Sequence, residues 1–149
     1  MTKKFVLSRT MFENLVKHLV DIEDGKSKLF EKYFLEPSKE RNEYEEIFDN
    51  YITKIDRIIR STTVTDDAEN CIPFSIIGSE VEVKDTESHE TFRFRIVPPF
   101  QENVGSTDVS CLSPVGKSLL LKKVGEKAVV NAPAGVFCYQ IKSINLPLQ

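Results

Sequence analysis

Apolar residues recur at alternating intervals of three and four along two stretches of the chain, residues 8–34 and residues 38–60. This period is typical of helices that pack against each other along a coiled-coil seam. The sequence therefore predicts two long amphipathic helices, one for each stretch. Their seam positions are Phe12, Leu15, Leu19, Ile22, Lys26, Leu29 and Tyr33 in the first, where Lys26 is the one polar member, and Tyr44, Phe48, Tyr51, Ile55 and Ile58 in the second.

The break between the two stretches lies at Pro37. Proline disfavours helical geometry at the residue before it, Glu36, and has no N–H to donate within a helix. The second helix begins either with Ser38 as its N-cap or with Pro37 as its first residue. Two helices joined by so few residues form an antiparallel hairpin, in which each arm is roughly 35–40 Å long. We therefore expect a projecting coiled-coil finger over residues 1–60 with residues 36–40 at its tip.

Beyond the finger the pattern changes. Residues 61–73 are polar and have no helical period, which is typical of a linker. From residue 74 onward, apolar residues fall in short runs that mostly alternate with polar ones, as in antiparallel strands with one buried face. Ser113 and Pro114 mark the cap and the first residue of one short helix. Residues 74–149 are therefore predicted to form a small antiparallel sheet with one helix, and the chain is α+β in class. The apolar members of the runs are Val81 and Val83; Phe92, Phe94 and Ile96; Val109 and Cys111; Val129 and Val130; and Phe137, Tyr139 and Ile141.

The composition narrows the classes of function. The chain has 149 residues, 40% of them apolar and 29% charged, with a formal net charge of -3. A nucleic-acid coat or a membrane-surface protein usually carries a basic surplus, so both are disfavoured. We expect no membrane-spanning segment and no signal peptide. Three widely spaced cysteines, Cys71, Cys111 and Cys138, favour reduced thiols in a cytoplasmic protein. The histidines, His18 and His89, are too isolated to predict a metal site, and each is expected to face solvent or be satisfied by a partner.

The second domain carries motifs of a known family. Residues 113–120, 122–126 and 129–135, followed by Tyr139, are similar to the C-terminal domain of GreA and GreB, the bacterial transcript-cleavage factors. The likeness covers nearly all of residues 74–145. It implies an FKBP-like fold that binds RNA polymerase and is not a working prolyl isomerase. The predicted finger resembles the N-terminal antiparallel coiled coil of the same family.

The tip resembles that of the family with one departure. Residues 39–44 match in a register that puts Glu40 on the family's glutamate and Pro37 where the family has an aspartate, so that Glu36 is the nearest second carboxylate. The resemblance implies that Glu36 and Glu40 are the catalytic residues and hold a Mg²⁺ ion shared with the polymerase active site. The protein would have no cofactor of its own. Magnesium suits this role because it is typically held by one or two carboxylates together with phosphates.

The resemblance also implies a partner and a function. Gre factors bind bacterial RNA polymerase at the rim of its secondary channel, and their tip stimulates cleavage of backtracked RNA. The factor itself is not an enzyme, and it acts on the RNA end only indirectly. Because Pro37 replaces the aspartate, a second interpretation stays open. In that interpretation the finger occupies the channel without promoting cleavage, as in the regulator of nucleoside diphosphate kinase or in inhibitory Gre homologues.

Two segments are candidates for the contact with polymerase. After the second predicted strand, typical Gre proteins have a glycine and then acidic residues, whereas this chain has Pro98, Pro99 and Phe100. These residues either contact polymerase or cover the sheet. The resemblance also assigns Ser113 and Pro114 to the polymerase-binding surface.

Two functions from other classes fit the sequence less well. A prolyl isomerase needs an apolar pocket lined by aromatic side chains. Here the aromatic residues of the second domain alternate as sheet core, and the chain has no Trp. A module that dimerises through a helical seam needs that seam to be free, whereas the hairpin uses it within one chain. We therefore expect a monomer.

Overall fold

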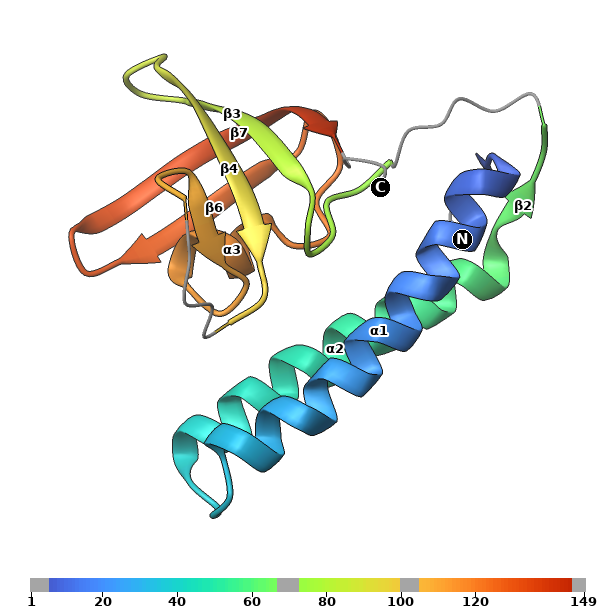
Figure 1. The fold of residues 1–149 in the computed structure, drawn as a ribbon. Coiled ribbons are helices and arrows are strands. Elements are labelled where there is room, and N and C mark those ends of the chain that lie inside the picture. The colour runs from blue at the N-terminus through green and yellow to red at the C-terminus, as the bar shows by residue number, and fades with distance from the viewer. Residues whose placement is uncertain (1–5, 67–72, 100–104, 146–149) are drawn as a thin grey trace. The chain divides into compact units, whose positions relative to one another are not determined.

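The computed structural model describes residues 6–66, 73–99 and 105–145 (Figure 1). The chain forms two compact units, Met1–Asn70 and Cys71–Gln149. The first is a helical hairpin and the second is a mixed β-sheet with a short helix, so the predicted α+β class is confirmed. Among the described residues, no helix combines the length and the apolar character that crossing a lipid bilayer requires.

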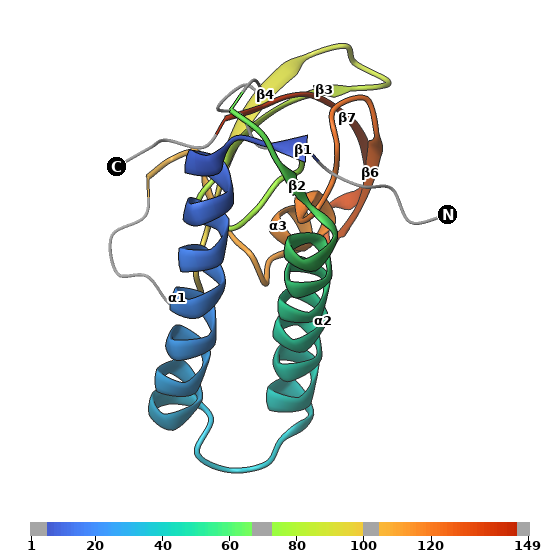
Figure 2. The same ribbon diagram turned by 90° about the vertical axis from the view of Figure 1, so that its right-hand side faces the viewer.

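Two long helices form the first unit. Helix α1 spans Arg9–Tyr33 and helix α2 spans Lys39–Ser61, and they lie side by side and antiparallel in both views (Figures 1 and 2). A serine caps each helix: the side chains of Ser8 and Ser38 accept from the backbone N–H three residues later, at 3.1 Å and 3.0 Å. Of the two predicted starts for α2, the Ser38 N-cap is therefore the one that forms. With 25 and 23 residues, the helices are about 37 Å and 35 Å long.

The seam between α1 and α2 departs from the predicted period near both ends. At the start of α1, Met11, which lies off the period, is 2% exposed, whereas the predicted Phe12 is half-buried. At the tip, Tyr33 is 45% exposed, whereas Phe34, which also lies off the period, is only 8% exposed. Phe34 is the C-cap of α1, and its backbone (φ -129°, ψ 57°) leaves the helical path. Because its backbone is not helical, the Phe34 side chain is buried although the helical period does not place it in the seam. The predicted seam residues that are fully buried are Leu15, Phe48, Tyr51 and Ile55.

A short parallel pair of strands joins the two ends of the hairpin. Strand β1 spans Val6–Leu7 and strand β2 spans Thr63–Val64, and the Thr65 N–H donates to the Leu7 carbonyl at 3.0 Å. The polar pattern of residues 61–73 predicts a linker, whereas the structure places part of it in this strand pair. Two residues are too few to show a strand period. The pair forms because the antiparallel helices bring the residues before α1 next to the residues after α2.

The second unit is a five-stranded sheet in the order β5-β4-β3-β7-β6. Three neighbouring pairs are antiparallel, but β5 runs parallel to β4, which corrects the prediction of a purely antiparallel sheet. Alternation of apolar and polar residues shows which face is buried and carries no information on strand direction. The elements are β3 (Glu80–Asp85), β4 (Thr91–Val97), β5 (Asp108–Ser110), α3 (Pro114–Leu119), β6 (Lys127–Ala132) and β7 (Gly135–Asn145).

Helix α3 packs closely against the sheet. Its residue Gly116 is buried, and a Cβ atom added there would lie 1.8 Å from the Ser110 carbonyl oxygen. Only glycine allows this approach. Beside the helix, Cys111 is a free buried thiol, and burial raises its pKa to about 12, so that it is an unreactive core residue. The apolar core of the unit includes Val81, Val83, Ile96, Leu119, Ala128, Val130, Tyr139 and Ile141.

The predicted core pattern fails at one aromatic residue of β7. Phe137 is 36% exposed, although it shares a strand face with the buried Tyr139. Their rings lie nearly parallel with centroids 6.4 Å apart. Phe92 and Phe94 each contact Tyr139 as well, with ring centroids 5.9 Å apart in both cases. The aromatic residues therefore form one connected group that is only partly covered.

Candidate functional site

The tip of the hairpin carries both predicted carboxylates. Residues 34–38 connect the helices, and Glu36 lies in this connection. Glu40 lies in the first turn of α2, where the partial positive charge of the helix N-terminus favours a carboxylate. Both side chains are exposed. The tip therefore presents a carboxylate on either side of Pro37.

The donor atoms at the tip fit a magnesium ion only if other ligands contribute. Carboxylate oxygens are hard ligands of the kind that Mg²⁺ prefers. In the parts of the chain that the structure describes, no group of three His, Cys, Asp or Glu residues is arranged to hold a metal ion. Two carboxylates leave most of an octahedral shell to water, phosphate or a partner's side chains. The tip is therefore suited to sharing an ion.

An aromatic cluster, defined as Phe30, Phe34, Tyr44 and Phe48, lies at the tip end of the seam. The rings of Phe34 and Tyr44 meet edge to face with centroids 5.1 Å apart, and Phe34 contacts Phe30 at 5.3 Å. Phe30 in turn meets Phe48 of α2 at 6.2 Å. Such ring pairs contribute about 0.5–1.5 kcal/mol each beyond their buried area. The sequence did not single out Phe30 or Phe34, because neither falls on the three-four period.

Tyr44 connects this cluster to a candidate site residue. Glu40 lies one helical turn earlier on α2. The pKa of Tyr44 is raised, first by burial and then by its interaction with Glu40 and the negative charge of Glu43.

Cations reinforce the seam next to the cluster. Lys26, the polar member of the predicted seam, pairs with Asp49 across the hairpin, with Nζ 2.5 Å from Oδ1. The same Nζ atom lies 5.6 Å from the centre of the Phe30 ring, and Cζ of Arg41 lies 6.0 Å from it. Both distances are in the range of cation–π contacts. The lysine is tolerated in the seam because its charge is met by a carboxylate and a ring.

A second polar pair lies further from the tip. Nε2 of His18 on α1 is 2.7 Å from the Tyr51 hydroxyl on α2, and the two rings meet edge to face with centroids 6.0 Å apart. Burial lowers the pKa of His18 to about 4, although the charge of Asp21 opposes this effect. Of the two expectations for His18, the satisfied histidine is therefore the one observed.

The segments predicted to bind polymerase come together at one end of the sheet. Strands β4 and β5 run parallel with their last residues opposite each other, so the chain leaves both strands at the same end. Pro98 and Pro99 follow β4 directly, and Ser113 and Pro114 begin α3 shortly after β5. The sequence could not show this proximity, because the parallel pairing was not predicted.

The individual residues at this end of the sheet differ in their roles. Pro98 is exposed, whereas Pro99 is buried. Phe100 lies outside the described residues. The Ser113 hydroxyl accepts from a backbone N–H of α3 at 3.1 Å and donates to the Ser110 carbonyl at 2.6 Å. Pro98 is thus a free apolar surface, while the Ser113 hydroxyl is engaged in holding the helix.

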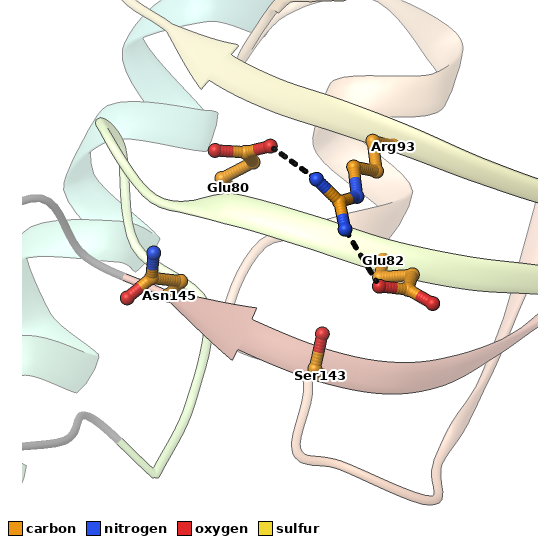
Figure 3. Close-up of a pocket in the computed structure, with 5 residues that line it drawn as sticks. All are labelled: Glu80, Glu82, Arg93, Ser143 and Asn145. Carbon is orange, nitrogen blue, oxygen red and sulfur yellow. Dashed lines mark ion pairs between the residues drawn. The ribbon is translucent and has the colours of Figure 1, made fainter.

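A shallow pocket lies elsewhere on the sheet, across strands β3, β4 and β7 (Figure 3). In it Arg93 extends between two carboxylates, with guanidinium nitrogens 3.9 Å from Glu80 and 3.6 Å from Glu82. None of the predicted site residues lines this pocket. Because its cation is shared by two carboxylates, it offers no strong charge to a ligand. Its other lining residues are Ser143 and Asn145.

Comparison with known proteins connects these features to one class, the transcription elongation factors. Residues 76–146 match the family described as "Transcription elongation factor, GreA/GreB, C-term". The chain is 31% identical over 153 residues to transcription elongation factor GreA of Thermotoga petrophila, with 95% of this chain and 97% of that protein covered. The same identity and coverage hold for GreA of Clostridium acetobutylicum. The chain belongs to the GreA/GreB family, which confirms the resemblance seen in the sequence.

A solved structure supports the fold. The chain is similar to the prokaryotic transcription elongation factor GreA/GreB from Nitrosomonas europaea, with a TM-score of 0.51 and 20% identity. The match covers 97% of this chain and 99% of that one. Both the hairpin and the sheet unit therefore have counterparts in a protein of this family.

Proposed function

We propose that this protein inserts its helical finger into the secondary channel of bacterial RNA polymerase and stimulates cleavage of backtracked RNA. One observation carries the proposal: Glu36 and Glu40 are exposed at the tip of an antiparallel hairpin in a chain of the GreA/GreB family. The cleavage is the polymerase's own reaction, so the protein is not an enzyme by itself. A protein with this partner works in the bacterial cytoplasm.

In the proposed complex, Glu36 and Glu40 would be this chain's ligands for a Mg²⁺ ion shared with the polymerase active site. Such an ion activates water for hydrolysis and stabilises the leaving oxygen. This chain contributes by placing the two carboxylates and by holding the tip that carries them in a fixed conformation. The two helices, each about 35 Å long, place the carboxylates at the end of the hairpin opposite strands β1 and β2. The Ser38 cap and the aromatic cluster fix the tip against the helices.

The decisive experiment uses a stalled, backtracked bacterial polymerase with labelled RNA. Wild-type protein should speed up shortening of the RNA, and Glu40→Ala should abolish this effect while binding to polymerase survives. Glu36→Ala should weaken the effect. Glu13→Ala is the matched control, because Glu13 is an exposed glutamate near the other end of α1. If wild-type protein binds polymerase and never shortens the RNA, the cleavage proposal is wrong.

That outcome would favour the second candidate function, in which the finger occupies the channel without promoting cleavage. Pro37 is the observation behind it, because it occupies the tip position at which the sequence match places the family's aspartate and its side chain offers no ligand atom. The same assay separates the two functions. A non-cleaving factor would compete with an active Gre factor for polymerase and slow the cleavage that the active factor promotes.

We also propose that the segment Pro98, Pro99 and Phe100, through its exposed residue Pro98, and the start of α3 at Ser113 and Pro114 contact polymerase at the channel rim. The exposure of Pro98 beside the start of α3 supports this surface. Pro98→Glu should weaken binding to polymerase without changing the unfolding midpoint. Thr91→Glu is the control, since Thr91 is an exposed residue at the opposite end of β4. Equal binding of the two variants would contradict the proposed surface.

A further inference from the structure

Two polar pairs cross the seam of the finger, and the proposed function gives neither of them a role. Nε2 of His18 lies 2.7 Å from the Tyr51 hydroxyl, and Nζ of Lys26 lies 2.5 Å from Oδ1 of Asp49. The Lys26 side chain is only 22% exposed, and its ammonium group also lies 5.6 Å from the centre of the Phe30 ring. We call the two contacts, His18 with Tyr51 and Lys26 with Asp49, the register pairs. Each joins α1 to α2, so each depends on how far one helix is shifted along the other.

The apolar residues of the seam do not fix this shift by themselves. They recur every three or four residues, so a helix moved by one turn again presents an apolar stripe to its partner. A polar group in such a seam discriminates between registers, because only some registers give it a partner. Lys26 is the clearest case, since an ammonium group largely removed from water is unfavourable unless it is paired.

A one-turn shift of α2 would remove the partner of His18 in either direction. The residues four positions before and after Tyr51 are Ile47 and Ile55. An isoleucine side chain has no hydrogen-bonding group. The imidazole nitrogen that packing holds between the helices would therefore lose its hydrogen bond, which is unfavourable for a polar group away from water.

The same shift would change the surroundings of Lys26. One direction replaces Asp49 by Thr53, which carries no charge, and the other replaces it by Glu45. A carboxylate thus remains opposite the ammonium group in one direction only, and that direction still removes the partner of His18. The observed register satisfies both polar side chains of α1, whereas neither shifted register does.

The register determines where the two carboxylates of the tip lie relative to each other. Glu36 follows the end of α1, and Glu40 lies in the first turn of α2. Moving one helix by a turn displaces its end by about 5.4 Å. A magnesium ion holds its ligands at about 2.0–2.1 Å in near-ideal octahedral geometry, so it does not tolerate a displacement of this size.

We propose that the register pairs hold α1 and α2 in one register and thereby act as positioning residues for the two carboxylates of the tip. The role in cleavage rests on the proposed function, whereas the register is a property of the free protein. Polar pairs in a seam select one arrangement more than they stabilise it. Apolar replacements should therefore keep the hairpin folded and remove its single register.

The first test replaces the register pairs by apolar residues in the whole chain. The seam variant carries His18→Leu, Lys26→Met, Asp49→Leu and Tyr51→Phe. It should keep wild-type helicity and at least wild-type resistance to urea, because packed apolar residues can replace a buried ion pair without loss of stability. Wild-type protein should give one set of NMR signals for the Phe30 and Phe48 rings, with an NOE between them, since their centroids are 6.2 Å apart. The seam variant should give several sets.

Two further comparisons show whether pairing is the cause. In the control variant, Lys28→Met and Asp24→Leu remove an exposed 3.0 Å ion pair that lies within α1 alone, and one set of ring signals should remain. Lys26→Glu brings two carboxylates together across the seam and should disturb the register. Adding Asp49→Lys should restore one set of signals. A role in packing alone would not be rescued by this exchange of charges.

The second test measures cleavage of backtracked RNA by polymerase. The seam variant should still bind polymerase, but at saturating concentration it should support cleavage at least about tenfold more slowly than wild type, since a misplacement of about 1 Å can cost about 100-fold. The control variant and the charge-exchanged variant should both support cleavage at the wild-type rate.

The outcomes separate this inference from the proposed function. One set of ring signals in the seam variant, or a charge exchange that restores nothing, overturns the register assignment. If the seam variant has several registers and supports wild-type cleavage while Glu40→Ala abolishes it, the positioning role is wrong and the proposed function stands. If Glu40→Ala leaves cleavage unchanged, the proposed function fails and the positioning role fails with it, whereas the NMR spectra still decide the register.

Discussion

Protonation of His18 should loosen the hairpin near its middle. The imidazole is packed between the helices, with Nε2 2.7 Å from the Tyr51 hydroxyl. Burial lowers its pKa to about 4 from an ordinary value of 6.5. Since the folded state takes up the proton less readily than the unfolded chain, the contribution to stability is complete above about pH 6.5 and is lost as the pH falls through the folded pKa.

The size of the effect follows from the difference between the two pKa values. Each unit of difference corresponds to about 1.4 kcal/mol between the two protonation states. With a folded pKa of about 4, the hairpin should lose about 2 kcal/mol by pH 5 and about 3 kcal/mol by pH 4 through this group alone. The nearby charge of Asp21 opposes the shift and is already included in the folded pKa.

The assay compares wild-type protein with His18→Gln. Glutamine can hydrogen-bond with Tyr51 from a similar position and does not titrate. Urea unfolding is followed by far-ultraviolet circular dichroism, which reports mainly on the hairpin because α1 and α2 have 25 and 23 residues and α3 has six. Between neutral pH and about pH 4, wild-type protein should lose about 3 kcal/mol more stability than the variant.

The carboxylates of the chain also titrate in this range, but they are common to both proteins and cancel in the comparison. The reasoning is refuted if wild type and His18→Gln lose stability in parallel as the pH falls. Parallel curves would mean that the imidazole is as easily protonated in the hairpin as in the unfolded chain.

Three further predictions concern stability. Gly25→Ala should raise the free energy of unfolding of the hairpin by about 1 kcal/mol, because an added Cβ inside α1 meets nothing within 4 Å. A lower urea midpoint than that of wild-type protein would contradict this. Gly116→Ala should lower the free energy of unfolding of the sheet unit by about 1–3 kcal/mol or more, because the added Cβ would overlap the Ser110 carbonyl. Amide hydrogen exchange in β6 and β7 should become faster. Exchange at the wild-type rate would contradict this prediction. Ser38→Ala should destabilise the hairpin by about 1 kcal/mol through loss of the N-cap, whereas Ser27→Ala within α1 should not; equal midpoints would show that the cap contributes nothing.

Much of the first unit could be predicted because its determinants are local. The apolar period requires only neighbouring turns of one helix, and the Ser38 cap acts on an N–H three residues away. The position of Glu36 and Glu40 at the tip follows from Pro37 alone. Tyr33 was wrongly placed in the buried seam, because a periodic pattern assumes helical backbone and the helix ends at that residue.

Other features of the sites depended on residues far apart in the chain. The parallel pairing of β4 with β5 brings Pro98 close to the start of α3, and no local pattern encodes strand direction. The closeness of Phe34 to Tyr44 depends on how the connection folds back. Lys26 and Asp49 are 23 residues apart in the chain, and their ion pair depends on the register between the helices.

The sequence by itself determined the helical finger, its acidic tip, the strand-rich second unit and, through its motifs, the family. These are properties of local periodicity, of capping and of residue type, which a linear chain displays directly. Only the tertiary structure decided the strand pair at the ends of the hairpin, the direction of β5, the burial of Pro99 and the contact between the rings of Phe34 and Tyr44. These features depend on distances between residues that chain spacing does not fix, and the ring contact also needs side-chain orientations that a period does not specify.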